Sequence, residues 1–205
     1  MDASAAGSYP SCREGFSVRV AIIGSSGSGK STLAKSLGGA LGAPVIELDA
    51  LNWQPGWRDL ATQDPDAFRN AIAAAVEPDR WVTDGNYSRF AWPLILPRAT
   101  DLIWLDYSRP VIMKRVIERS FMRAVSGAEL WPGTGNREEF KKWLDREHPI
   151  RWAWDTFDER RKSFSSLFER LQDKPIRLHR LRDPREARAL VDRFASDGNS
   201  PSPQK

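Results

Sequence analysis

Residues 18–37 read VRVAIIGSSGSGKSTLAKSL, and this stretch decides the fold. It opens with a β-branched, apolar run, which predicts a strand buried on both faces. The next eight residues, 24–31, match the pattern G-x-x-x-x-G-K-[ST] at every fixed position. A segment that favours helix follows, with Leu33, Ala34 and Leu37 on one face. A strand, a glycine-rich loop and a helix in this order predict a site for the phosphates of a nucleoside triphosphate.

Each residue type in the loop suits the binding of a triphosphate. The glycines let the backbone turn tightly, so that successive N–H groups surround a phosphate, and the helix N-terminus favours an anion. Lys30 can reach the β- and γ-phosphates, and the Ser31 hydroxyl is placed to bind Mg²⁺. The sequence therefore predicts ATP and Mg²⁺ as cofactors. The predicted nucleotide-binding residues in this stretch are Gly24, Ser25, Ser26, Gly27, Ser28, Gly29, Lys30, Ser31 and Thr32.

Composition narrows the class of protein. The 205-residue chain carries a net charge of +4, and most of its 31 basic residues are arginine. Arginine suits bidentate contact with phosphate, so this bias favours a phosphate site over a nucleic-acid-binding stripe. The single cysteine excludes a disulfide framework and a cysteine-based metal site. Residues 1–15 lack the apolar core of a signal peptide, and no run approaches a membrane span. We therefore expect a cytoplasmic protein without a membrane partner.

The rest of the chain alternates strand and helix patterns between two small, polar tails at 1–15 and 196–205. This alternation predicts one α/β domain over 16–195, in which helices cover both faces of a parallel sheet. Further strands are expected at 43–48, 80–83, 101–105 and 176–181. Helices are expected at 64–76, from about 110 onward, and at 184–194. Asp64 and Asp183 are the expected caps of the first and last of these helices.

Three short stretches resemble P-loop kinases of small molecules. DGNYSR, at 84–89, resembles the Asp-Gly-Phe-Pro-Arg stretch of adenylate kinases, although it lacks the proline. Phe68-Arg69 is similar to the Phe-Arg of shikimate kinases, whose arginine binds the acceptor carboxylate. Asp49 resembles the acidic residue that shikimate and gluconate kinases place near the acceptor hydroxyl. Together with LDALNWQPGW and LIWLDYSRP, these stretches make residues 18–194 most similar to the bacterial adenylate-kinase-related proteins labelled "DNA topology modulation protein".

This resemblance implies a P-loop fold whose five-stranded parallel sheet has the order 2-3-1-4-5, with a helical lid over about 119–160. It also implies transfer of the γ-phosphate of ATP to a small acceptor, which is a nucleotide, a nucleoside or a hydroxy metabolite. However, the segment between Leu41 and Asp84 is too short for a full nucleoside-monophosphate-binding segment. An ATPase or ATP-sensing regulatory protein without a dedicated acceptor, with or without an association with nucleic acid, stays open as the alternative. Nucleic acid is not an expected partner, because no DNA-reading module is visible; both a monomer and a homodimer fit.

Asp49, Asp84 and Asp106 each follow a predicted strand, where open α/β sheets bind their ligands. Kinases of the resembled type place the third strand beside the first, which brings Asp84 closest to Ser31. We therefore predict Ser31 and Asp84 as the metal site, and Asp106 as a helix cap or a brace of its loop. Asp49 is a candidate general base for the acceptor hydroxyl, and a turn-capping role explains it equally well.

Arginines recur every four residues along the helix that begins near 110, at Arg115, Arg119 and Arg123. This spacing stacks them on one helix face. In kinases of the resembled shape this helix leads into the lid, so Arg119 and Arg123 are candidate catalytic residues that neutralise the transferred phosphoryl group. Arg115 is a candidate nucleotide ligand, and Arg182 a candidate partner of the adenine base. A solvated helix face explains the same spacing of the three arginines.

Two further groups have weaker signals. Trp53 and Trp57, around a Pro-Gly turn, either wall an acceptor pocket or anchor their loop to the core. Arg160 and Arg161 are candidates for a second phosphate contact. The glycine-containing stretch 131–136 is typical of a lid tip or hinge, and a structural loop has the same composition.

Overall fold

The computed structural model describes residues 17–126, 129–131, 133–136 and 148–199. The predicted N-terminal tail lies outside these residues, as do 127–128, 132 and 137–147 of the predicted lid. The last helix continues to Asn199, so only residues 200–205 of the predicted C-terminal tail lie outside the described part.

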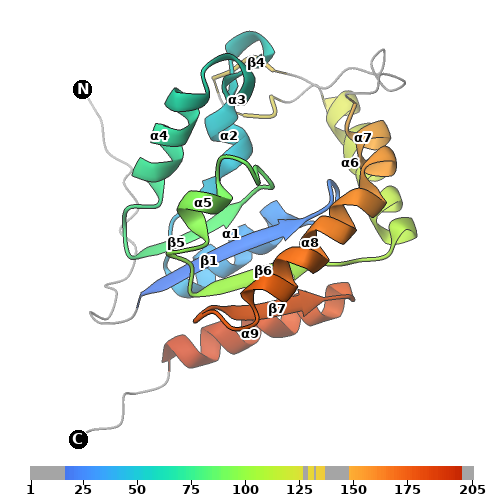
Figure 1. Ribbon diagram of the computed structural model, residues 1–205. Helices are drawn as coiled ribbons and strands as arrows, with labels where there is room; N and C mark the ends of the chain where they lie inside the picture. The colour runs from blue at the N-terminus through green and yellow to red at the C-terminus, as the bar shows by residue number, and fades with distance from the viewer. Residues whose placement is uncertain (1–16, 127–128, 132, 137–147, 200–205) are drawn as a thin grey trace, which may run out of the picture.

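A five-stranded parallel sheet forms the centre of the molecule (Figure 1). Its strands are β1 (Val18–Gly24), β2 (Val45–Glu47), β5 (Arg80–Asp84), β6 (Asp101–Leu105) and β7 (Arg177–Leu181). Their order across the sheet is β2-β5-β1-β6-β7, which is 2-3-1-4-5 when these five strands are counted along the chain. The labels differ from that count because two short strands, β3 (Trp53–Gln54) and β4 (Arg58–Asp59), lie between β2 and β5 in the chain. They pair as an antiparallel hairpin, which the sequence pattern did not predict.

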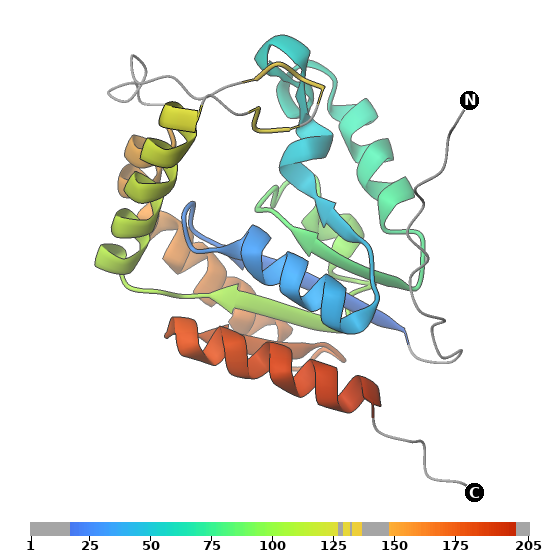
Figure 2. The same cartoon turned by 180° about the vertical axis from the view of Figure 1, so that it is seen from behind.

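Helices cover both faces of this sheet, as the alternating pattern predicts. The helices α1 (Lys30–Leu41) and α9 (Pro184–Asn199) pack against each other on the face seen in Figure 2. The helices α4 (Pro65–Ala75), α5 (Trp92–Ile95) and α8 (Phe157–Leu171) lie on the opposite face. Alternate residues of β1 feed the two cores: Val20 and Ile22 face α1, whereas Ile23 joins Phe68 in the second core. The β1 run is therefore buried on both sides, which explains its unbroken apolar pattern.

Two helix starts follow the predicted capping chemistry. Asp64 accepts a hydrogen bond from the backbone N–H of Ala67, and Pro65 occupies the first turn of α4. At the start of α9, the Asp183 carboxylate accepts a hydrogen bond at 2.8 Å from the backbone N–H of Arg185. These side chains satisfy N–H groups that have no partner within the helix.

The remaining elements connect these layers. After β2 come α2 (Leu48–Asn52), the hairpin with its 3-10 turn η1 (Pro55–Trp57), and α3 (Leu60–Gln63). Between β6 and β7 lie α6 (Arg109–Ser126), α7 (Pro149–Asp155) and α8. The second strand therefore ends at Glu47, earlier than its apolar run predicts, and Asp49 lies in the first turn of α2. No helix in the described part of the chain combines the length and apolar character that a bilayer crossing requires.

Candidate active site

The loop between β1 and α1 has the compact conformation that its glycines predict. Gly27 and Gly29 have φ values of 81° and 94°, a region that side chains with a Cβ rarely adopt. Gly29 is also the N-cap residue of α1, and Lys30 is the first residue of that helix. A Cβ on Gly27 would lie 2.9 Å from the Cβ of Val116, so α6 packs directly on the loop. Glycine at this position therefore serves both backbone conformation and close packing.

Asn86 braces the beginning of the loop, although it follows a different strand. Its side-chain amide donates to the backbone carbonyl of Gly24 at 2.6 Å and accepts from the N–H of Gly24 at 3.2 Å. Both main-chain polar groups of Gly24 are thereby satisfied by one side chain. Sequence reasoning missed this role, because it treated Asn86 only as a member of the stretch DGNYSR.

Charged groups of both signs gather around Lys30. The Nζ atom of Lys30 donates to the backbone carbonyl of Ser25 at 3.2 Å, so the side chain folds back over the loop. Burial lowers the pKa of Lys30, whereas the negative charges of Asp84 and Asp49 act in the opposite direction. Arg160, from α8, adds to the lowering of the pKa of Lys30, and so does Arg119. The structure thus brings the predicted residues Lys30, Asp84 and Asp49 into one electrostatic cluster.

Asp84 lies at the end of β5, directly beside β1. Its Cα is paired with that of Ile22, and only 7% of the residue is exposed. Burial raises the pKa of Asp84, while the charge of Lys30 and a hydrogen bond with the Ser31 side chain oppose that rise. A hydroxyl and a carboxylate side by side are oxygen donors of the kind that Mg²⁺ prefers when substrate phosphates and water complete its coordination. These two residues therefore fit the predicted metal site.

Asp49 faces the cluster from α2, and Tyr87 holds it. The Tyr87 hydroxyl donates to the Oδ1 atom of Asp49 at 2.8 Å. Burial raises the pKa of Tyr87, and the neighbouring charge of Asp49 raises it further. The tyrosine therefore stays protonated and keeps donating to Asp49. Its ring packs edge-on against Phe68 at 4.9 Å, which fixes the direction of the hydroxyl. The sequence contained no signal for this partner.

Two of the three predicted α6 arginines touch the loop. Arg115 donates from Nη1 to the carbonyl of Ser28 at 2.9 Å, and Arg119 donates from Nη2 to the hydroxyl of Ser26 at 3.3 Å. Arg123 lies one helical turn further toward the end of α6. The spacing of four thus has the predicted effect of placing successive arginines along one face, and that face meets the loop at Arg115 and Arg119.

Asp106 forms ion pairs with arginines, whereas Asp84 is the carboxylate that lies beside Ser31. Its buried carboxylate accepts from Arg161 at 2.8 Å and from Arg180 at 2.7 Å. Arg182, whose side chain is 67% exposed, lies further away, with its Nε atom 4.0 Å from the same carboxylate. These contacts match the bracing role among the two roles considered for Asp106, and they pair Arg161 with a carboxylate.

Arg69 and the pair Trp53 and Trp57, which the sequence also offered as acceptor-site candidates, make contacts outside the charged cluster. Arg69 lies 3.5 Å from Asp66 on the exposed side of α4, and its guanidinium lies over the ring of Phe90. Trp53 and Trp57 pack edge to face at 5.7 Å, and Trp131 stacks on Trp53 with ring centroids 6.4 Å apart. This aromatic cluster favours the interpretation of both tryptophans as anchors of their loop.

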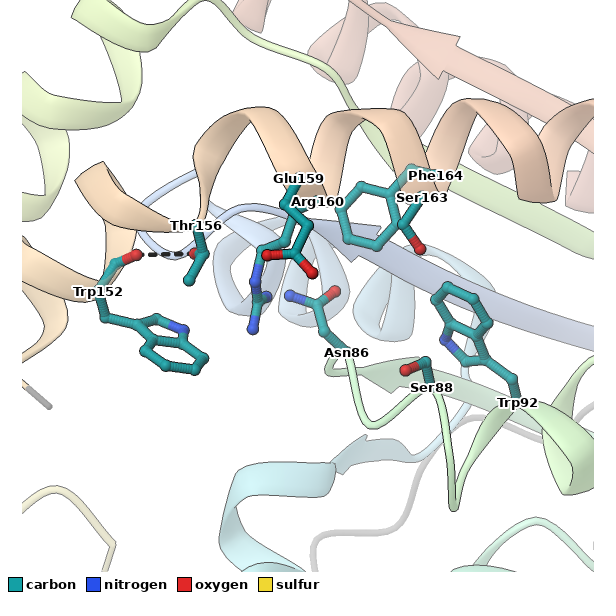
Figure 3. Close-up of a pocket in the computed structure, with 9 residues that line it drawn as sticks. All are labelled: Asn86, Ser88, Trp92, Trp152, Thr156, Glu159, Arg160, Ser163 and Phe164. Carbon is teal, nitrogen blue, oxygen red and sulfur yellow. Dashed lines mark hydrogen bonds between the residues drawn. The ribbon is translucent and has the colours of Figure 1, made fainter.

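A pocket of about 240 Å³ opens beside the charged cluster, between the segment after β5 and the helices α7 and α8 (Figure 3). Arg160 connects the two, because it lines the pocket while the charge of Asp49 acts on it. Burial lowers the pKa of Arg160, and Asp49 and Glu159 oppose that lowering. The pocket is lined by Asn86, Ser88, Trp92, Trp152, Thr156, Glu159, Arg160, Ser163 and Phe164.

Comparison with known proteins identifies the fold. No protein-family model and no curated protein sequence matches this chain. Among solved structures, the shikimate kinase of Bacteroides thetaiotaomicron is similar with a TM-score of 0.54 and 14% identity, over 87% of this chain and 97% of that one. The shikimate kinase of Acinetobacter baumannii in complex with shikimate is similar with a TM-score of 0.53 and 12% identity, over 86% and 90%. At this identity the likeness shows a shared fold alone.

Proposed function

We propose that this protein is a Mg²⁺-dependent phosphotransferase, which moves the γ-phosphate of ATP to a hydroxyl group of a small molecule. The proposal rests on one juxtaposition: Lys30, Asp84 and Asp49 interact electrostatically at the glycine-rich loop, and Asp49 also interacts with Arg160, which lines the pocket. The sequence resemblance to adenylate-kinase-related proteins and the shared fold support a kinase of this group. A cytoplasmic location follows from the requirement for ATP.

The loop and its neighbours supply the groups that phosphoryl transfer requires. The N–H groups of residues 24–32 and the ammonium group of Lys30 hold the phosphates. Ser31 and Asp84 would hold Mg²⁺, which neutralises charge on the β- and γ-phosphates. Asp49, held by Tyr87, orients the acceptor hydroxyl and accepts its proton.

Arginines complete the proposed site. Arg119 and Arg123 neutralise the charge that spreads over the transferred phosphoryl group, and Arg115 holds the loop that binds the nucleotide. Arg182, at the end of β7, is the proposed neighbour of the adenine base.

Substitution of Lys30 tests this function. We expect Lys30→Met to abolish ADP formation while leaving the circular dichroism spectrum and cooperative unfolding intact. Lys35→Met, on the exposed side of the same helix where Lys35 pairs with Glu47, is the matched control and should retain activity. Turnover by Lys30→Met would contradict the proposal. ADP formation that is equally fast with and without any acceptor would favour an ATPase over a kinase.

A further inference from the structure

The pocket beside Asp49 contains polar groups that the fold itself does not use. Within the described part of the chain, the side chains of Glu159, Ser88 and Ser163 form no hydrogen bond or ion pair, and the guanidinium of Arg160 lies over the ring of Trp152, 5.4 Å from its centroid. In Figure 3, the carboxylate of Glu159 and the guanidinium of Arg160 extend from α8 toward Asn86. These donors and acceptors are therefore available to a bound molecule.

The charges that face this pocket cancel. Glu159 and Arg160 contribute one charge of each sign to the lining, and Asp49 lies close enough to act on Arg160. An anionic group near Arg160 would also meet the carboxylate of Glu159, which would repel it, and the charges of Asp49 and Lys30 near Arg160 have opposite signs. Arg69, the candidate anchor for an acceptor carboxylate, is engaged with Asp66 on α4 and does not line the pocket. The lining therefore offers no uncompensated positive charge to a carboxylate or phosphate.

The remaining lining combines aromatic surface with neutral hydrogen-bonding groups. Trp92, Trp152 and Phe164 supply apolar area, and Ser88 and Ser163 supply hydroxyl groups. The indole N–H of Trp92 is buried without a hydrogen-bond partner among the described residues. At about 240 Å³, the pocket is smaller than the range of roughly 300–1,000 Å³ that is usual for larger organic ligands.

We propose that the pocket takes a neutral, polyhydroxylated acceptor of about monosaccharide size, in preference to a hydroxy acid or a nucleoside monophosphate. This inference rests on the proposed function. Glu159 accepts hydrogen bonds from ligand hydroxyls, Arg160 and the serines donate to them, and the aromatic rings cover the C–H faces of the ligand.

Phosphoryl transfer then replaces one P–O bond by another. The oxygen of one acceptor hydroxyl forms a bond to the γ-phosphorus of ATP, and the bond from that phosphorus to the β,γ-bridging oxygen breaks. Asp49 takes the hydroxyl proton. The products are ADP and a phosphate monoester of the acceptor.

Calorimetric titration with matched ligand pairs tests the acceptor class independently of turnover. The full chain, saturated with a non-hydrolysable ATP analogue, is titrated with glucose against gluconate and with myo-inositol against myo-inositol 1-phosphate; AMP is titrated alone. We expect at least one neutral ligand to bind ten times more tightly than its anionic partner. Tighter binding of the anionic member of each pair, or no binding by either neutral ligand, overturns the inference.

Glu159 provides the second arm of the test. Glu159→Gln should lower the affinity for the neutral ligand about three- to tenfold, because an amide accepts hydrogen bonds less strongly than a carboxylate. The same variant should strengthen any residual binding of the anionic partner. Glu169→Gln, at an exposed position further along α8, is the control and should change neither. Unchanged neutral binding in Glu159→Gln contradicts the assignment. Failure of the ATP analogue to bind would instead refute the proposed function. The experiment therefore distinguishes failure of the acceptor class from failure of the proposed function.

Discussion

Replacement of Asn86 by alanine should loosen the phosphate loop at its first residue. Two hydrogen bonds to Gly24 are lost, each worth about 0.5–1.5 kcal/mol. Because Gly24 is buried, its N–H and C=O groups are also left without the side chain that satisfies them, which adds a penalty. We expect the free energy of unfolding to fall by about 3 kcal/mol in total, which for a chain of this length corresponds to roughly 6–12 °C in the unfolding midpoint.

Asn86→Asp removes the hydrogen-bond donor of the side chain but keeps its acceptor, so it tests the two hydrogen bonds to Gly24 separately. The introduced carboxylate still accepts from the Gly24 N–H, but its second oxygen faces the Gly24 carbonyl, which the Asn86 amide approaches to 2.6 Å. Two acceptors then oppose each other without a proton between them. At neutral pH we expect Asn86→Asp to be at least as destabilised as Asn86→Ala, and to recover stability in acid as the carboxyl gains a proton that it can donate.

Thermal and urea unfolding measure these differences, and calorimetry with an ATP analogue measures the affinity of the loop. Asn70→Ala, at an exposed position on α4, is the matched control, and we expect it to lie within about 0.5 kcal/mol of the wild type. Nucleotide affinity should fall at least tenfold in both Asn86 variants. If Asn86→Ala keeps wild-type stability and affinity, Asn86 does not brace the loop. If Asn86→Asp keeps wild-type stability, the hydrogen bond from the Asn86 amide to the Gly24 carbonyl does not contribute to it.

Burial raises the pKa of Asp84 above 3.8, so the free protein loses stability as pH rises from there through the folded value; Asp84→Asn should raise the unfolding midpoint at neutral pH while abolishing turnover. Burial alone would raise the pKa of Asp101, but hydrogen bonds from His179 and Arg177 lower it to about 2. The stability that this provides should be lost as pH falls from about 4 toward 2, and Asp101→Asn should flatten that acid limb in urea unfolding. Gly27→Ala should reduce nucleotide affinity at least tenfold and stability by at least about 1 kcal/mol, because its φ is 81° and α6 leaves no space for a Cβ; wild-type binding would contradict this.

The fold could largely be predicted from local patterns. The apolar runs at β1, β5 and β6, the caps at Asp64 and Asp183, and the glycine-rich loop each depend on residues close together in the chain. The helix α2 and the hairpin β3–β4 were missed, because these short elements of two to five residues are set by their contacts and not by a periodic pattern.

The candidate site was only partly visible in the chain. Lys30, Ser31 and the loop glycines follow from a contiguous motif, and Asp84 follows from its position at a strand end. Asn86 and Tyr87 could not be recognised, because their partners Gly24 and Asp49 lie 62 and 38 residues away. A side chain that braces a distant backbone group leaves no periodic or spacing signal of its own.

The sequence by itself determined that a strand, a glycine-rich loop and a helix form a phosphate-binding element, since φ angles, backbone N–H groups and helix dipoles are local properties. Only the tertiary structure decided which side chains surround that element. It placed Asp84 beside Ser31, committed Asp106 to Arg161 and Arg180, and set Arg160 between Asp49 and a pocket. These choices depend on the order of strands and the packing of α8, and therefore on the whole hydrophobic core.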